Sequence, residues 1–240
     1  MLIESARQQY NAGAPQITFL YQNVRDLSAI ASVMDRYAGF ELHEQDERRV
    51  VYKDFFDQNL IDEREVLQKM SFLLKTILRE LAEASRSHGS HPDIATPRQY
   101  LDALRKQGRL LERHFLRSRQ VSRDRFTVFL ASRSFVKIGA FFLEFLELLT
   151  VLDEQQMMRF VTPKFQKFSV LYDRVSRSFF DDQRDVAARL KEDLLGETDR
   201  LQGEIMGAPD VLLALSLTLL KNVLHELVRI TELGVLVAEL

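Results

Sequence analysis

The chain of 240 residues contains no cysteine and is poor in proline and glycine, with five and nine residues of these types. The absence of cysteine excludes disulfides, thiolate nucleophiles and thiolate metal sites. No phosphate loop of the GxxxxGK[ST] or GxGxxG kind and no GxSxG elbow occurs in the sequence. The motifs of nucleotide-binding proteins and serine hydrolases are therefore missing, and we expect a protein that is not an enzyme.

Strong charge of one sign and long apolar runs are also missing. The formal net charge is −2, which argues against a polycation that coats nucleic acid or a membrane surface. The longest apolar run, "VLLALSLTLL" (211–220), ends at Lys221 and is shorter than the ~20 residues that span a bilayer. The start of the chain lacks the basic-then-apolar pattern of a signal peptide. We expect a cytoplasmic protein without a transmembrane segment.

The first 62 residues differ in pattern from the rest of the chain. "QITFLY" (16–21) is rich in β-formers, and "FELHEQ" (40–45) and "RRVVYKDF" (48–55) flank a short turn, as in a hairpin. Between them, residues 23–39 carry apolar side chains at helical spacing. The sequence predicts a small α/β unit over residues 1–62.

The remaining residues read as six helices. Asp62 and Glu65 form a capping-box pattern ahead of the first of them. The third and sixth helices are apolar on most sides, which is typical of buried helices. They contain the similar sequences "FVKIGAFFLEFLE" (135–147) and "LVRITELGVLVAE" (227–239), whose offset of 92 residues fits the whole helical part. The predicted fold is mainly α, with the α/β unit followed by two tandem three-helix bundles, residues 63–152 and 153–240.

The helical part resembles a known family. The segments "LRKQGRLLERHFLRS" (104–118) and "LLGETDRLQGEI" (194–205) look like the second-helix signature of PhoU domains. The third helices of those domains carry a basic-Ile-small core, and the similar positions here are residues 137–139 and 229–230. We identify the chain as resembling PhoU domains over its two predicted bundles.

The N-terminal part adds to this resemblance. Residues 39–70 are similar to the stretch that joins a DNA-binding hairpin domain to the PhoU domain in archaeal regulators, and we expect no such hairpin domain ahead of it in this protein. The resemblance implies a regulatory adaptor in phosphate uptake or signalling, with a phosphate transporter subunit or a sensor kinase as its protein partner.

The metal-binding acids of that family are mostly replaced. Its members bind metal through two acids four residues apart on each third helix, and such acids share one helix face. The corresponding positions here are Val136 and Ala140 in the first copy and Val228 and Glu232 in the second. A hard cation needs several oxygen ligands, which one glutamate does not supply. We expect no metal and no other cofactor.

Glu144 and Glu147 offer an alternative acid pair on one face of the third helix. Together with Glu232 they could hold an ion if the two bundles faced each other at these residues. A solvated helix edge, or pairing with arginine, is the commoner role of such acids.

The densest basic run spans residues 105–125. Its arginines toward the helix end and the following turn are Arg113, Arg117, Arg119, Arg123 and Arg125. Arginine forks bind carboxylate or phosphate well, so this group is a candidate contact for an acidic partner or an anion. The simpler explanation is a solvated helix end favoured by the helix dipole. The run shows no aromatic interleaving of the kind that stacks bases, so we expect no direct nucleic-acid contact.

Two other functions stay open. One is a transcription-related regulatory module that works with a DNA-binding partner, because residues 39–70 are similar to a segment found beside DNA-binding domains. The other is a homo-oligomeric helical scaffold, in which the apolar third and sixth helices would form part of an interface between copies.

Overall fold

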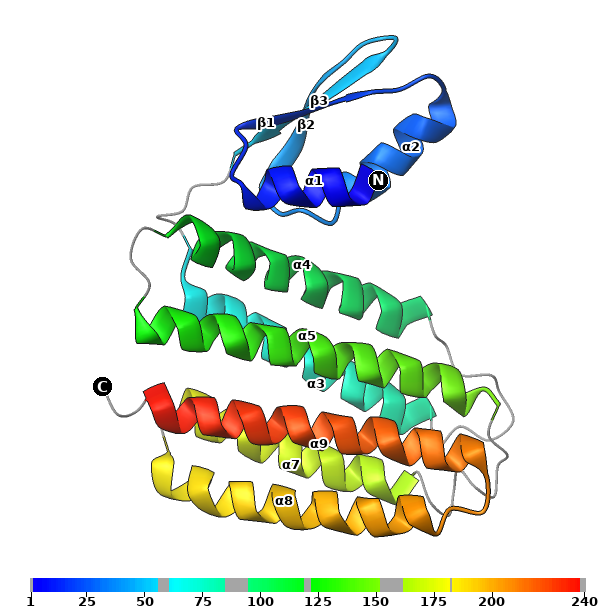
Figure 1. Ribbon diagram of the computed structural model, residues 1–240, viewed down its shortest axis with the longest axis vertical. Coiled ribbons are helices and arrows are strands. Elements are labelled where there is room, and N and C mark those ends of the chain that lie inside the picture. Colours follow the sequence, from blue (N-terminus) through cyan, green and yellow to red (C-terminus); the bar gives the residue numbers. More distant parts are fainter. Residues whose placement is uncertain are drawn as a thin grey trace. The chain divides into compact units, whose positions relative to one another are not determined.

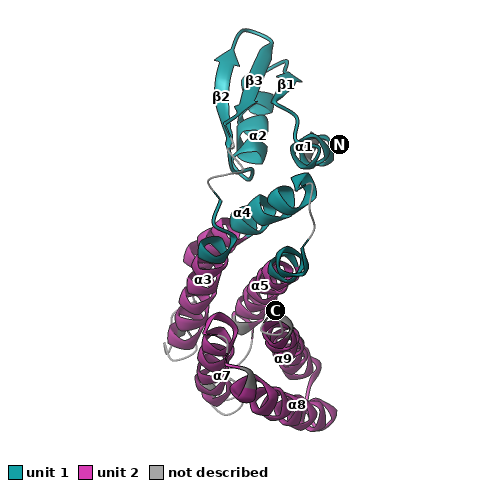
Figure 2. Ribbon diagram, turned by 90° about the vertical axis from the view of Figure 1, so that its left-hand side faces the viewer, with its two compact units in different colours: residues 1–66, 105–129 teal, residues 67–104, 130–240 magenta. Residues whose placement is uncertain are grey.

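The computed structural model describes residues 2–55, 61–84, 95–118, 122–151, 162–181 and 183–237. It is mainly helical, with a small antiparallel sheet near the N-terminus, which confirms the coarse fold class (Figure 1). The chain divides into two compact units, Met1–Val66 with Arg105–Phe129 and Leu67–Leu104 with Leu130–Leu240 (Figure 2). The predicted domain boundaries after residues 62 and 152 stay a prediction.

The first unit contains α1 (Leu2–Asn11), β1 (Gln16–Leu20), α2 (Val24–Met34), β2 (Phe40–Gln45) and β3 (Arg49–Asp54). β3 is the central strand and pairs antiparallel with both β1 and β2. The turn between β2 and β3 is closed by Asp46, whose Oδ1 accepts hydrogen bonds from the backbone N–H of Arg48 at 3.0 Å and Arg49 at 2.8 Å. The predicted hairpin is therefore present.

The core of the first unit lies between this sheet and its two N-terminal helices. The pairing of Ile17 with Tyr52 in β1 and β3 places both side chains on the same face of the sheet. Tyr10 from α1 and Ile30 from α2 belong to the same buried cluster. The alternation of apolar and polar residues in β1 thus selects the face that the helices cover.

The six longer helices are α3 (Glu63–Ala84), α4 (Ala95–Arg117), α5 (Arg123–Leu149), α7 (Thr162–Phe180), α8 (Arg184–Met206) and α9 (Val211–Val237). Asp62 caps α3, because its Oδ1 accepts hydrogen bonds from the N–H groups of Arg64 at 2.9 Å and Glu65 at 3.1 Å. Pro163 lies in the first turn of α7, where a missing N–H costs nothing.

In the second unit, α5 packs closely against α3 and α4 at Gly139. A Cβ atom at this position would lie 2.6 Å from Leu104, 2.9 Å from Leu101 and 3.4 Å from Leu74. Only glycine leaves room for these leucines. The buried side chains along α5 include Phe135, Ile138, Phe142 and Phe145.

Polar contacts join helices of the second unit that are far apart in sequence. Between α5 and α9, Ser134 Oγ donates to Glu226 Oε2 at 2.6 Å and Lys137 Nζ to Oε1 of the same residue at 2.9 Å. Between α3 and α7, the hydroxyls of Ser71 and Tyr172 lie 2.9 Å apart. Burial raises the pKa of Tyr172 far above its ordinary value, so this phenol stays protonated.

Within the described ranges, two helical stretches, Arg123–Leu148 and Val211–Val235, are long and apolar enough to cross a membrane by length and composition alone. In each, 44% of the residues in the most apolar window are buried inside the structure. Core helices of globular proteins pass the same test, so the absence of a transmembrane segment stays a prediction.

Candidate functional site

The structure buries one of the five arginines that were predicted to contact a partner. Arg113, in α4, is 0% exposed, and its Nη1 lies 3.1 Å from Asp54 Oδ1, with Nη2 bonded to Oδ2. Its guanidinium also lies 4.4 Å from the ring centre of Tyr10 and 5.1 Å from that of Phe40. This corrects the expectation for Arg113, because its guanidinium is buried inside the first unit and pairs with Asp54 there. The same burial raises the pKa of Tyr10 to about 12, against the opposing charge of Arg113.

The other arginines of the run divide between internal contacts and the surface. Arg117 Nη1 lies 3.3 Å from Asp54 Oδ2, and Arg125 Nε lies 3.2 Å from Glu63 Oε1. Arg123 is exposed at the start of α5, and Arg119 lies outside the described residues. A partner contact through Arg117, Arg123 and Arg125 stays a prediction.

Two of the three weak metal candidates, Glu147 and Glu232, have separate ion-pair partners. Glu147 accepts a hydrogen bond from Arg98 at 2.7 Å, and Glu232 lies 2.7 Å from Lys191. Glu144 is exposed on α5. Over the ranges that the structure covers, no three acidic or histidine side chains come close enough to hold a metal ion. The expectation that the chain uses no metal and no other cofactor stays a prediction.

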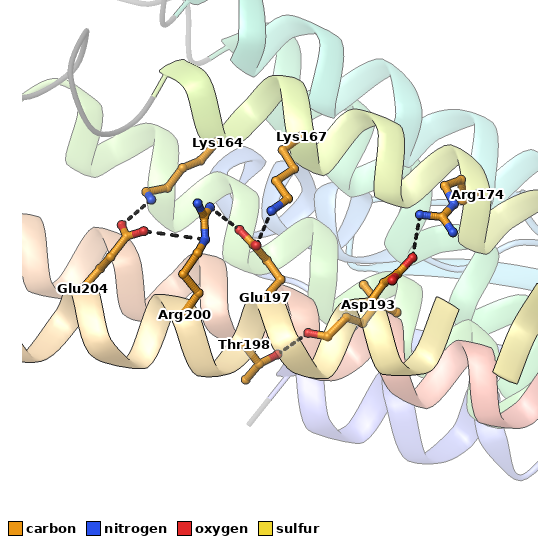
Figure 3. A network of polar contacts seen from close by, with 9 residues as sticks. Lys164, Lys167, Arg174, Asp193, Glu197, Thr198, Arg200 and Glu204 are labelled. Atoms are coloured by element: carbon orange, nitrogen blue, oxygen red, sulfur yellow. Dashed lines mark hydrogen bonds and ion pairs between the residues drawn. The ribbon is translucent and has the colours of Figure 1, made fainter. Parts of the chain in front are cut away.

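Within the described residues, a dense set of charged contacts joins α7 to α8 in the second unit. Lys164 and Lys167 share one face of α7, three residues apart, and Glu197, Arg200 and Glu204 share one face of α8. Lys164 bonds to Glu204 and Lys167 to Glu197. Arg200 lies between the two acids, with Nη2 2.5 Å from Glu197 Oε1 and Nε 3.8 Å from Glu204 Oε1 (Figure 3). We call these five side chains the α7–α8 charge cluster.

Further along the same two helices, Arg174 Nη1 lies 2.9 Å from Asp193 Oδ2. Positions that rise along α7 therefore pair with positions that fall along α8, so the helices run antiparallel (Figure 3). This arrangement lines up the charged faces of both helices.

One acid of the cluster, Glu197, is held in its charged form. Glu197 is only 5% exposed, and burial by itself would raise its pKa. Hydrogen bonds from Lys167 and Arg200 outweigh burial and hold the pKa of Glu197 below its ordinary value. The carboxylate is thus ionised at neutral pH and fixes both cations.

A cavity of about 540 Å³ adjoins the charge cluster. Lys164, Lys167, Arg200 and Glu204 line one part of it, and its other lining residues are Pro163, Gly207, Ala208, Pro209, Leu213 and Leu217. Its size is within the ~300–1,000 Å³ that is usual for small-molecule sites. Such a mixture of a few charged groups and apolar walls suits a ligand that has a charged group and an apolar part.

Exposed apolar side chains surround the turn between α8 and α9. Met206 is 80% and Val211 73% exposed, and Leu212 and Leu215 are also exposed. Val211 and Leu215 are four residues apart and share a face of α9. We call these four residues the α8–α9 apolar patch. The turn that joins its two parts, Gly207 to Pro209, also lines the cavity.

The sequence contains a signal for this site that composition did not reveal. The spacings Glu197-x-x-Arg200 and Arg200-x-x-x-Glu204 place alternating charges on one face of α8. The spacing Lys164-x-x-Lys167 places two cations on one face of α7. Each pattern alone is typical of a solvated helix. Only the packing of α7 on α8 brings them together.

No protein-family model, curated protein or solved structure matches this chain.

Proposed function

We propose that this chain is a regulatory adaptor in phosphate uptake or signalling that acts in the cytoplasm by protein–protein contact and not as an enzyme. The PhoU-like segments of its helices support this function, together with a mainly helical structure. The partner implied by the resemblance is a phosphate transporter subunit or a sensor kinase.

We also propose that the helical part consists of two related three-helix bundles. The pair Ser134 and Glu226 supports this repeat, because its members are 92 residues apart and hydrogen bond to each other at 2.6 Å. The pair Ile138 and Ile230 has the same offset, and both residues are fully buried. Corresponding parts of two copies meet in this way when the copies pack face to face.

The α8–α9 apolar patch is the observation that carries the adaptor function. Clusters of exposed apolar side chains on a folded protein commonly mark contact sites for other proteins. Lys167 and Arg200, each about half exposed, line the adjoining cavity. Charge complementarity therefore favours a partner segment that carries apolar side chains next to acidic ones.

The test is a pull-down of the tagged full chain from its native cells, grown with scarce and with ample phosphate. We expect the wild-type chain to recover a phosphate transporter subunit or a sensor kinase, in amounts that change with phosphate. Leu215→Asp should lower this recovery to about a tenth or less, as for a central interface residue. Val170→Asp also replaces an exposed apolar residue by aspartate, but on α7 and outside the patch, and should leave recovery unchanged.

Other recoveries would replace this function. DNA-binding proteins alone would favour the transcription-related module. Recovery of the chain by itself alone, in multimers that Leu215→Asp dissociates, would favour the oligomeric scaffold. Equal recovery of the transporter or kinase by Leu215→Asp and wild type would place the docking surface elsewhere.

A further inference from the structure

The cavity beside the α7–α8 charge cluster has a net positive charge. Lys164, Lys167 and Arg200 are cations, while Glu197 and Glu204 are carboxylates, so the cluster carries one net positive charge at neutral pH. A ligand with a single negative charge would balance it. A phosphate monoester, with a charge of about −1.5 to −2 at neutral pH, would exceed it.

Lys164 is the cation best placed to hold such a ligand. An ammonium group has three N–H donors, and the side chain of Lys164 is only 9% exposed. Within the described part of the chain, its hydrogen bond goes to Glu204. Because water barely reaches this ammonium group, an acceptor in the cavity would bind N–H donors that are costly to leave without a hydrogen-bond partner.

The remaining walls of the cavity require an apolar body. Leu213 and Leu217, from α9, are each 1% exposed and line the cavity together with Pro163, Ala208 and Pro209. Because the two leucines are already buried, the apolar surface open to the cavity belongs to the exposed Pro163 and Pro209 and the half-buried Ala208. A small inorganic anion would leave this surface uncovered, whereas an aliphatic chain would remove it from water. The charged and apolar linings together define an amphipathic ligand.

We propose that this cavity binds a small amphipathic monoanion, namely a carboxylate attached to an apolar chain. The carboxylate oxygens accept hydrogen bonds from Lys164 and Arg200, and the apolar chain lies against Pro163, Ala208 and Pro209. This site goes beyond the docking function and does not depend on it, because the ligand would bind to the chain alone.

Isothermal titration calorimetry of the full chain with octanoate tests this site. We expect one octanoate per chain, and an affinity at least about tenfold higher than for octan-1-ol, which has the same chain without the charge. Lys164→Met should weaken octanoate binding at least about tenfold. Lys191→Met removes the same charge from another ion pair, with Glu232 at 2.7 Å, and should keep wild-type affinity.

Several results would overturn the site. These are no binding of octanoate, equal affinities for octanoate and octan-1-ol, or unchanged affinity in Lys164→Met. Inorganic phosphate binding as tightly as octanoate would show that the apolar chain is not recognised. If Lys164→Met does not fold, the comparison of octanoate with octan-1-ol on the wild-type chain decides. Leu215→Asp should keep octanoate binding, so loss of docking and loss of the ligand site are distinguishable.

Discussion

Replacement of Arg113 by methionine is the sharpest test of the first unit. Arg113 is fully buried, and it holds the nearly buried Asp54 through two hydrogen bonds. Methionine preserves much of the apolar volume but removes the charge, so it leaves Asp54 without its main partner. Removing one member of a buried pair costs about 3–5 kcal/mol, because the other charge stays buried.

The structure places the expected cost near the lower end of this range. Arg117 Nη1 remains 3.3 Å from Asp54 and would compensate in part. The contacts of Arg113 with Tyr10 and Phe40 are also lost, which adds about 0.5–2 kcal/mol. We expect a loss of about 3 kcal/mol, a change of somewhat more than a hundredfold in the unfolding equilibrium of the first unit.

Hydrogen exchange of the β1 and β3 amides, read by mass spectrometry, measures this loss within the first unit alone. The matched control is Arg49→Met, which removes an exposed arginine 3.2 Å from Asp46 and should cost less than about 1 kcal/mol. The double variant Arg113→Met with Asp54→Leu should recover most of the loss, since both charges are then gone. An effect of Arg113→Met no larger than that of Arg49→Met would refute the reasoning. So would a double variant whose loss of stability equals the sum of the losses in Arg113→Met and Asp54→Leu alone.

Two further predictions concern the second unit. Gly139→Ala should lower stability, by about 1 kcal/mol in urea denaturation, because overpacking against Leu101 and Leu104 costs more than the gain in helix propensity. Gly203→Ala, with nothing within 4 Å of the new methyl, should raise stability by about 0.5–1 kcal/mol, and equal signs for the two variants would contradict this. Glu197→Gln should be less stable than wild type at neutral pH, and the difference should shrink as pH falls below 4.5, the ordinary pKa of the carboxyl. The sign follows from the lowered pKa of Glu197 in the folded state, which makes its stabilising effect present at higher pH and lost in acid; a difference that does not change with pH would disprove it.

The local features of the fold could be read from the sequence because neighbouring residues create them. The β2–β3 hairpin follows from β-formers on both sides of a short turn, and Asp46 closes that turn through residues two and three positions away. The cap of α3 likewise depends on Asp62 and the two N–H groups just after it. Interactions of this range are encoded by spacing alone.

The candidate site could be predicted only in part. The sequence indicated where arginines gather, but the role of Arg113 depends on Asp54, which is 59 residues away. The pairing of Lys164 with Glu204 joins residues 40 positions apart. Spacing within one helix shows which residues share a face, but it does not show which other helix covers that face.

The sequence by itself determined the kinds of elements and the apolar stripes that drive them together. Tertiary structure alone decided that Arg113 is internal, that Gly139 leaves room for Leu104, and that two ordinary charged faces of α7 and α8 form a cluster beside a cavity. The physical reason is that burial and charge pairing depend on what packs against a residue. Non-directional apolar attraction specifies that a face is covered, whereas close packing of particular side chains decides which other element covers it.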